Sequence, residues 1–165
     1  MARTTTEHRI LIQSSDKDGR VQLENLASGN FRCLPGMLLK NNSGTMIAHP
    51  TAGSFLPAKL VALECPWPDT DASATSAAID IYYKAGDTLR YIQARPGDVC
   101  NMLLGTASGS AAATEGISQM VSDGLGGVIV ASGTALQDNE IVGVPDESVD
   151  NSGETTYARL KVRII

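Results

Sequence analysis

The sequence holds two histidines, His8 and His49, and imidazole is the side chain most often used as a general acid or base near neutral pH. His49 stands directly before Pro50, and a general base there needs a partner that the neighbouring residues do not supply. The sequence has no G-x-S-x-G motif, so it offers no serine nucleophile on a strained turn. A hydrolytic site would therefore require the fold to place His49 in a pocket beside a buried carboxylate.

Three groups of acidic residues have the side chains that bind cations. Asp16–Gly19 reads DKDG, as in part of a calcium loop, but position twelve of that register is Asn25 rather than a bidentate Glu. Asp69 and Asp71 form a D-x-D pair in a proline-containing stretch that is typical of an exposed loop. The third group, near the C-terminus, has no fixed spacing and consists of Asp146, Glu147, Asp150 and Glu154. Solvated turns are favoured for all three, and we expect no metal, no cofactor and no enzymatic activity.

The three cysteines, Cys33, Cys65 and Cys100, lie far apart in the sequence. Their odd number argues against the disulfide framework of a small secreted protein. No C-x-x-C pair is present, and two histidines do not complete a zinc site with such scattered thiols. Buried, reduced thiols are therefore expected, in a protein made in a reducing cytoplasm.

The charge of −5 is unevenly distributed along the 165 residues. From Gly97 to Ala158 there is no Lys or Arg, whereas this stretch contains nine acids: Asp98, Glu115, Asp123, Asp138, Glu140, Asp146, Glu147, Asp150 and Glu154. Such a surface repels phosphate backbones, so direct binding of nucleic acid is not expected. The N-terminal residues lack the apolar run of a signal peptide, and no segment has the roughly 18 apolar residues of a membrane helix.

Apolar residues recur in short alternating runs, and no segment carries a sustained 3.6-residue apolar stripe. Aromatic residues make up only 4% of the chain, so Val, Ile, Leu, Met and Ala must form the core. The pattern predicts an all-β fold, an antiparallel barrel or sandwich, jelly-roll- or tulip-like, of about ten short strands. The Gly105–Gly116 stretch is rich in Ala, Ser and Thr and is predicted to be a loop.

The two ends of the chain differ from its middle. Residues 1–20 are predicted to be a polar N-terminal arm or, equally, a first strand RILIQ, ahead of a single β domain at residues 21–165. In the last strand Ala158, Leu160, Val162 and Ile164 alternate with Arg159, Lys161 and Arg163, which predicts one buried and one outward face. We expect the acidic turn before it to complete a hairpin. The outward bases then either face water or an acidic neighbour, or guard a sheet edge.

Several short motifs follow one another from Pro35 onward. PGMLLKNN comes first, and later motifs are Y-x-x-G-D-T-x-R-Y, R-x-G-D, an S-D-G-x-G hairpin and a D-N-S-G turn into a basic strand; they occupy Tyr83–Tyr91, Arg95–Asp98, Gly116–Gly126 and Glu147–Ile165. This order resembles the small decoration, or cement, proteins of tailed-bacteriophage capsids, over roughly 130 of the 165 residues. Residues 67–76 and the arm before Arg20 lie outside the resemblance.

The resemblance implies a structural role on a virus particle. Such proteins bind the outer surface of an expanded phage head, commonly as homotrimers at threefold positions, and some bind as dimers. They strengthen the head against the pressure of the packaged DNA. It therefore implies the major capsid protein as partner, no direct contact with nucleic acid or membrane, synthesis in the host cytoplasm and a location on the outer capsid surface.

Cementing of this kind is multivalent binding, in which a closed oligomer engages several shell subunits together and exceeds the affinity of one contact by roughly 10²–10⁴. We expect the N-terminal arm to order on docking and to extend this grip. The residues expected to contact the capsid are Arg3, Arg9, Ile10, Leu11, Ile12 and Arg20.

Two alternative functions remain open at the level of sequence. The first is another structural module of the same particle, such as a tail, baseplate or head-fibre component. The second is a small β-barrel hydrolase or carbohydrate-binding domain, which predicts a concave pocket with convergent polar side chains.

Overall fold

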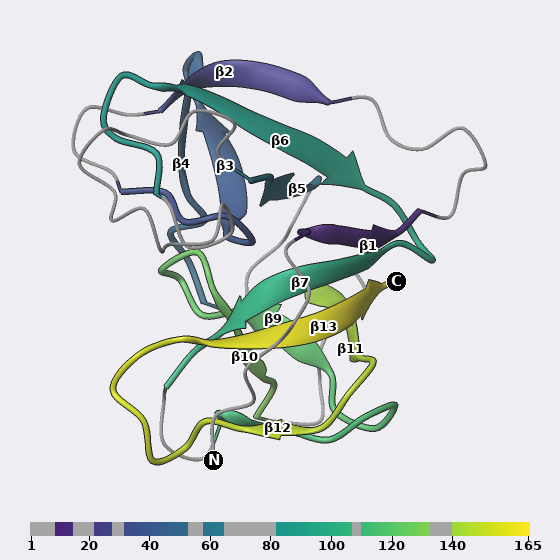
Figure 1. Ribbon diagram of the computed structural model, residues 1–165. Coiled ribbons are helices and arrows are strands. Elements are labelled where there is room, and N and C mark those ends of the chain that lie inside the picture. Colours follow the sequence, from purple (N-terminus) through teal and green to yellow (C-terminus); the bar gives the residue numbers. More distant parts are fainter. Residues whose placement is uncertain are drawn as a thin grey trace.

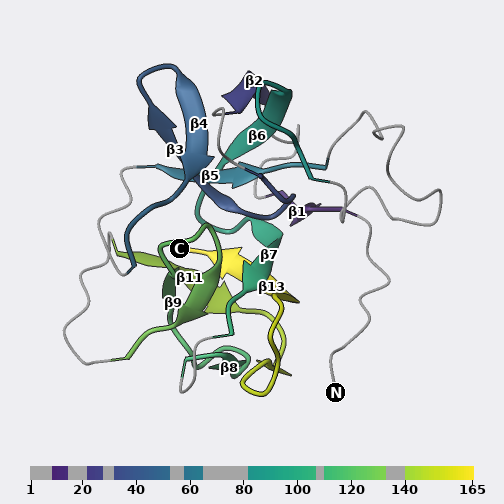
Figure 2. The same ribbon diagram turned by 90° about the vertical axis from the view of Figure 1, so that its left-hand side faces the viewer.

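The structure is a computed structural model that describes residues 9–14, 22–27, 32–52, 58–64, 82–106, 110–132 and 140–165. These residues contain thirteen strands and no helix, which confirms the predicted all-β class (Figure 1). The strands form two main layers, seen one above the other in Figures 1 and 2. The upper layer is a small barrel, and the lower layer is a larger sheet that contains the C-terminal strand.

The barrel closes in the order β2-β4-β3-β5-β6. Its strands are β2 (Leu23–Ala27), β3 (Leu38–Asn42), β4 (Thr45–Ala48), β5 (Lys59–Ala62) and β6 (Thr88–Ala94). Neighbouring strands are antiparallel except at one seam, where β2 and β4 run parallel. The predicted antiparallel barrel is thus present, with one parallel pair that closes it.

The lower layer, called here the C-terminal sheet, has the order β1-β7-β10-β9-β11-β13, and β7 also pairs with β13. Its strands are β1 (Leu11–Gln13), β7 (Val99–Leu104), β9 (Met120–Ser122), β10 (Val128–Val130), β11 (Ile141–Pro145) and β13 (Ala158–Ile164). The extra pairing closes five of the strands into a second ring. Below it lies a two-stranded sheet of β8 (Ala112–Ala113) and β12 (Val149–Asp150), so the predicted Gly105–Gly116 loop contains a short strand.

The regular last strand, β13, is held on both sides. Six of its residues pair with β7, from Ala158 opposite Leu104 to Arg163 opposite Val99, and its other side pairs with β11. Its side chains alternate as predicted, with Leu160, Val162 and Ile164 buried. Along Val162–Ile164 both edges of β13 are paired, so Arg163 does not guard a free sheet edge, whereas Arg159 lies beyond the pairing with β11.

The two layers contribute side chains to both of the buried clusters that form the core. Leu38, Val61 and Ile92 come from barrel strands but pack in the same buried cluster as the apolar side chains of β7 and β13. Leu103 of β7 instead packs in the cluster that fills the barrel. All six residues of β7 are buried, because one face of this strand covers its own ring and the other faces the barrel. The position of the layers is therefore set by packing on both faces of β7.

Candidate functional site

His49 lies where the barrel meets the C-terminal sheet. It directly follows β4, and its side chain is 5% exposed. Nδ1 of the ring lies 2.9 Å from Oγ of Ser122, the last residue of β9, which is 0% exposed. Oγ of Ser122 also accepts a hydrogen bond of 3.1 Å from the backbone N–H of Gly124. A histidine of the barrel is therefore hydrogen-bonded to a serine of the sheet in a buried position.

Asp123, next to this serine, organises the β9–β10 turn. Its Oδ1 accepts hydrogen bonds from the backbone N–H groups of Leu125, at 2.7 Å, and Gly127, at 2.8 Å. Its Oδ2 accepts a hydrogen bond of 2.9 Å from the hydroxyl of Tyr157. Burial and the adjacent Asp123 carboxylate raise the pKa of Tyr157, so the phenol stays protonated and remains a donor.

The glycines of the S-D-G-x-G motif allow this turn to approach its neighbours closely. Gly124 has a φ of +80°, and a Cβ added there would lie 2.9 Å from the backbone nitrogen of Ala52. Gly126, the last residue of the motif, has a φ of +95°, and a Cβ on Gly127, which follows the motif, would lie 2.5 Å from the ring of Tyr157. The turn also contacts the barrel directly, because the N–H of Leu38 donates to the carbonyl of Gly126 at 2.7 Å. The motif therefore builds the contact between the two layers.

A second contact between the layers joins β13 to the Pro35–Gly36 turn, which precedes β3. Nη1 of Arg159, on β13, donates a hydrogen bond of 2.6 Å to the carbonyl of Pro35. Gly36 has a φ of +84°, and a Cβ there would lie 2.5 Å from the backbone oxygen of Asn101 and 2.7 Å from Nη1 of Arg159. The Pro35–Gly36 turn thus needs glycine for its conformation and for the space. Together, the His49–Ser122–Asp123–Tyr157 network and the Arg159–Pro35 contact form what we call the joint.

The acidic turn is hydrogen-bonded to the basic strand of the same chain. Nη2 of Arg163 lies 2.8 Å from Oδ1 of Asp146, and both side chains are partly exposed. Oε1 of Glu147 accepts a hydrogen bond of 3.1 Å from the backbone N–H of Lys161. The terminal hairpin predicted from the sequence is formed by β11 and β13, while the residues between them make a detour through β12. Arg159 and Arg163 thus contact their own chain.

The N-terminal residues expected to contact a capsid are divided by the structure. Ile10 is 0% exposed and packs in the core, its carbonyl accepts a hydrogen bond of 2.7 Å from Asn101 N–H, and β1 pairs with β7. Ile10 therefore anchors the segment to its own domain, as in the alternative in which RILIQ is a first strand. Leu11 and Ile12 are half-buried and Arg9 is exposed, whereas Arg3 and Arg20 lie outside the described residues.

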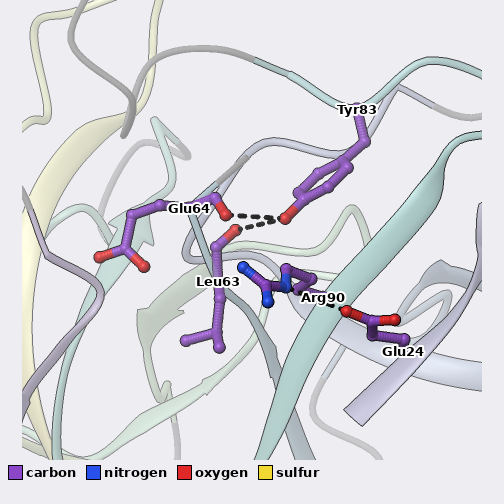
Figure 3. Close-up of polar contacts among 5 residues, drawn as sticks. All are labelled: Glu24, Leu63, Glu64, Tyr83 and Arg90. Atoms are coloured by element: carbon purple, nitrogen blue, oxygen red, sulfur yellow. Dashed lines mark hydrogen bonds and ion pairs between the residues drawn. The ribbon is translucent and has the colours of Figure 1, made fainter. Parts of the chain in front are cut away.

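The N-terminal segment is also held by Glu64, at the end of the barrel. Oε1 of Glu64 accepts a hydrogen bond from the N–H of Ile10. The backbone carbonyl of Glu64, at 2.9 Å, and that of Leu63, at 3.3 Å, accept from the buried hydroxyl of Tyr83. Figure 3 shows the Glu64 carboxylate pointing away from Tyr83, so these two contacts use opposite ends of the residue. Glu64 thereby links the first strand to the barrel core.

The joint does not have the geometry of a hydrolytic site. His49 does lie near a carboxylate, but both oxygens of Asp123 accept hydrogen bonds from the turn and from Tyr157. Among the described residues, no carboxylate is hydrogen-bonded to the imidazole, and Ser122 is too buried to meet a substrate. The network is suited to holding two layers together.

Within the described ranges, no three His, Cys, Asp or Glu side chains are grouped so as to hold a metal ion. Asp16–Gly19, Asp69 and Asp71 lie outside these ranges. Among the described residues, no helix has the length and apolar character needed to cross a bilayer.

Comparisons with known proteins assign no family. A scan against models of protein families gave no match, and a search of curated proteins found no similar sequence. The function therefore has to be inferred from the residues and contacts described above. The S-D-G-x-G motif indicated a tight hairpin in advance, but nothing in the sequence indicated that Tyr157 and His49 meet it.

Proposed function

We propose that this protein is a structural component of a phage particle, a cement protein that binds the outer surface of the head and bridges neighbouring major capsid proteins. The observation that carries the proposal is that the described polar clusters hold the scaffold together, while large apolar side chains are exposed on turns that are held by hydrogen bonds. The order of sequence motifs that resembles capsid decoration proteins supports the same role. Self-association, as a homotrimer, supplies the multivalency that such binding needs.

Two of the displayed side chains are large and apolar. Leu125 is 69% exposed at the tip of the turn that Asp123 organises. Ile117 is 77% exposed on the turn between β8 and β9. That turn is held by hydrogen bonds from Gly116 N–H to the carbonyl of Pro145, at 2.9 Å, and from Glu115 N–H to Oγ of Ser148, at 3.0 Å. A turn whose backbone is already held by hydrogen bonds loses less entropy on binding, so these two turns are the proposed contact points.

The chain segment that carries Ile117 is acidic. Among the described residues of 110–158, every charged side chain is an Asp or a Glu. Arg163 of β13 pairs with one of these acids, Asp146, and the other acids favour a partner with Lys and Arg and disfavour nucleic acid. This charge is compatible with a position on the outside of a filled head.

The test is binding to purified expanded heads that lack the protein, followed by reconstruction of the decorated particle. We expect density spread over the head lattice, and we expect Ile117→Asp and Leu125→Asp to weaken binding without lowering the melting temperature. Thr114→Asp is the matched control, an exposed position on the same turn as Ile117. Density only at one vertex or on the tail would favour a tail, baseplate or head-fibre role, and absence of binding would overturn the proposal.

A further inference from the structure

We propose that the His49–Ser122 pair is an acid-sensitive latch, in which the neutral imidazole holds the barrel against the C-terminal sheet and its protonation loosens that contact. This goes beyond the proposed role as a cement protein, because it concerns how firmly the two layers of one subunit are joined. It depends on the directions of the hydrogen bonds around Ser122 and on the charges that face His49.

The hydrogen bonds around Ser122 have a defined direction. Among the described residues, Oγ of the buried Ser122 has two hydrogen-bond neighbours, the backbone N–H of Gly124, which can only donate, and Nδ1 of His49. The hydroxyl proton of Ser122 therefore has an acceptor only when it donates to Nδ1, 2.9 Å away. A nitrogen accepts only when it carries no proton, which requires the neutral imidazole with its proton on Nε2. Protonation of Nδ1 would reverse this bond and leave the buried hydroxyl proton of Ser122 without its acceptor.

The charges around His49 add to this preference. Burial and, next, the Lys40 ammonium on β3 lower the pKa of His49, while a hydrogen bond with the Thr51 backbone and the Asp123 carboxylate act in the opposite direction. Asp123 on the β9–β10 turn is already hydrogen-bonded to two backbone N–H groups and to Tyr157, which is uncharged. No acidic side chain is therefore hydrogen-bonded to the imidazole among the described residues.

The contact that the latch supports crosses from one layer to the other. The carbonyl of Leu38, at the start of β3, accepts a hydrogen bond of 3.0 Å from the N–H of His49. The N–H of Leu38 in turn donates to the carbonyl of Gly126 in the β9–β10 turn. Ala52 forms a bridge with Asp123 nearby. Because the folded pKa of His49 is depressed below 6.5, its contribution to stability is complete above that pH and is lost as the pH falls through the folded pKa. Hydrogen exchange of the Leu38 amide therefore reports on this contact.

The experiment is NMR on the full chain with His8→Gln, which leaves His49 as the single histidine. At pH 7.5 we expect the tautomer with the proton on Nε2, and a titration midpoint below 6.5. Between pH 7.5 and 5 we expect the protection of the Leu38 amide to fall by roughly fivefold, as expected for loss of one net hydrogen bond. The amide of Gly97, which donates to Ile164 within the C-terminal sheet, corrects for the intrinsic effect of pH.

Two variants keep the test independent of folding problems in the core. Lys40→Gln changes an exposed side chain, and we expect it to move the midpoint of His49 upward. His49→Gln should remove the pH dependence of Leu38 protection between pH 7.5 and 5. A midpoint at or above 6.5, the opposite tautomer, or equal changes at Leu38 and Gly97 would each overturn the latch.

Discussion

The barrel and the C-terminal sheet both close into rings, but their closing seams differ in length. In the part of the chain that the structure describes, the barrel closes where β2 meets β4 over two residues, Leu26 and Ala27. The C-terminal sheet closes where β13 meets β7 over six. The β2–β4 seam is parallel and the β13–β7 seam antiparallel, although the second ring also has a short parallel seam, one pair between β10 and β7. The last strand of the chain thus closes its ring over more residues than β2 closes the barrel, while β2 depends mainly on its four pairs with β6.

The same contrast is visible in the side chains of the two strands. Leu160 of β13 is fully buried, whereas Leu26 of β2 is 52% exposed. A strand that closes a ring through buried side chains stabilises it through the hydrophobic effect as well as through backbone hydrogen bonds. Substitutions in the two regions should therefore have unequal effects.

The largest effect is expected from truncation of the long seam. Leu160→Ala should lower the free energy of unfolding by about 2–5 kcal/mol, because it removes buried methyl groups and leaves a cavity. Leu26→Ala, the matched change in the short seam, should change it by less than about 0.5 kcal/mol. Chemical denaturation measures both, and similar losses would show that the two seams contribute equally.

A slightly smaller effect is expected where the layers touch at Gly36. Gly36→Ala should cost about 2–4 kcal/mol, because the positive φ is strained and the new Cβ meets Asn101 and Arg159. Gly44→Ala is the control, since Gly44 has a φ of +91° but no neighbour within 4 Å. We expect the control to cost only about 1 kcal/mol by thermal unfolding. Equal costs would show that the contacts of the new Cβ at position 36 with Asn101 and Arg159 add nothing to the cost of the positive φ.

Substitution of two tyrosines compares the hydrogen bond of a tyrosine in the joint with those of a tyrosine in the barrel interior. Tyr157→Phe removes a hydrogen bond to a carboxylate and should cost about 1.5–3 kcal/mol. Tyr83→Phe removes hydrogen bonds to two neutral carbonyl groups and should cost about 1 kcal/mol. Denaturant midpoints of the two variants give the ranking, and a larger loss for Tyr83→Phe would contradict the importance assigned to Asp123.

The smallest effects are expected from the two exposed ion pairs, one in each region. Arg90 and Glu24 join β6 to β2 at 3.1 Å, and Arg163 and Asp146 join β13 to the acidic turn (Figure 3 shows the first pair). Arg90→Gln and Arg163→Gln should each cost below about 1 kcal/mol, less still in high salt. A loss that persists in high salt would show that the pair acts through packing instead of charge.

Local patterns were enough to predict the class of fold and much of its strand content. Alternation predicted the buried face of β13. The sequence did not distinguish an arm from a strand at Ile10–Gln13, because three or four residues carry too little periodicity. It also assigned the short strand β8 to a loop, since Ala and Thr have no pattern of their own and pair only because β12 lies beside them.

The joint was not predictable to the same degree. His49 and Ser122 are 73 residues apart, and Arg159 and Pro35 are 124 apart. No local rule connects such positions. The sequence suggested His49 as a candidate general base, whereas in the structure its side chain is hydrogen-bonded to Ser122 across the two layers.

By itself, the sequence determined which residues lie on the same face of each strand and where the chain turns, because side-chain alternation and glycine conformations are local properties. Only the tertiary structure decided that β13 lies between β7 and β11 and that His49, Ser122, Asp123 and Tyr157 form one network. These contacts join residues far apart in the sequence, such as His49 and Ser122, which are 73 residues apart. They form only when the two layers pack together, so no single segment contains them.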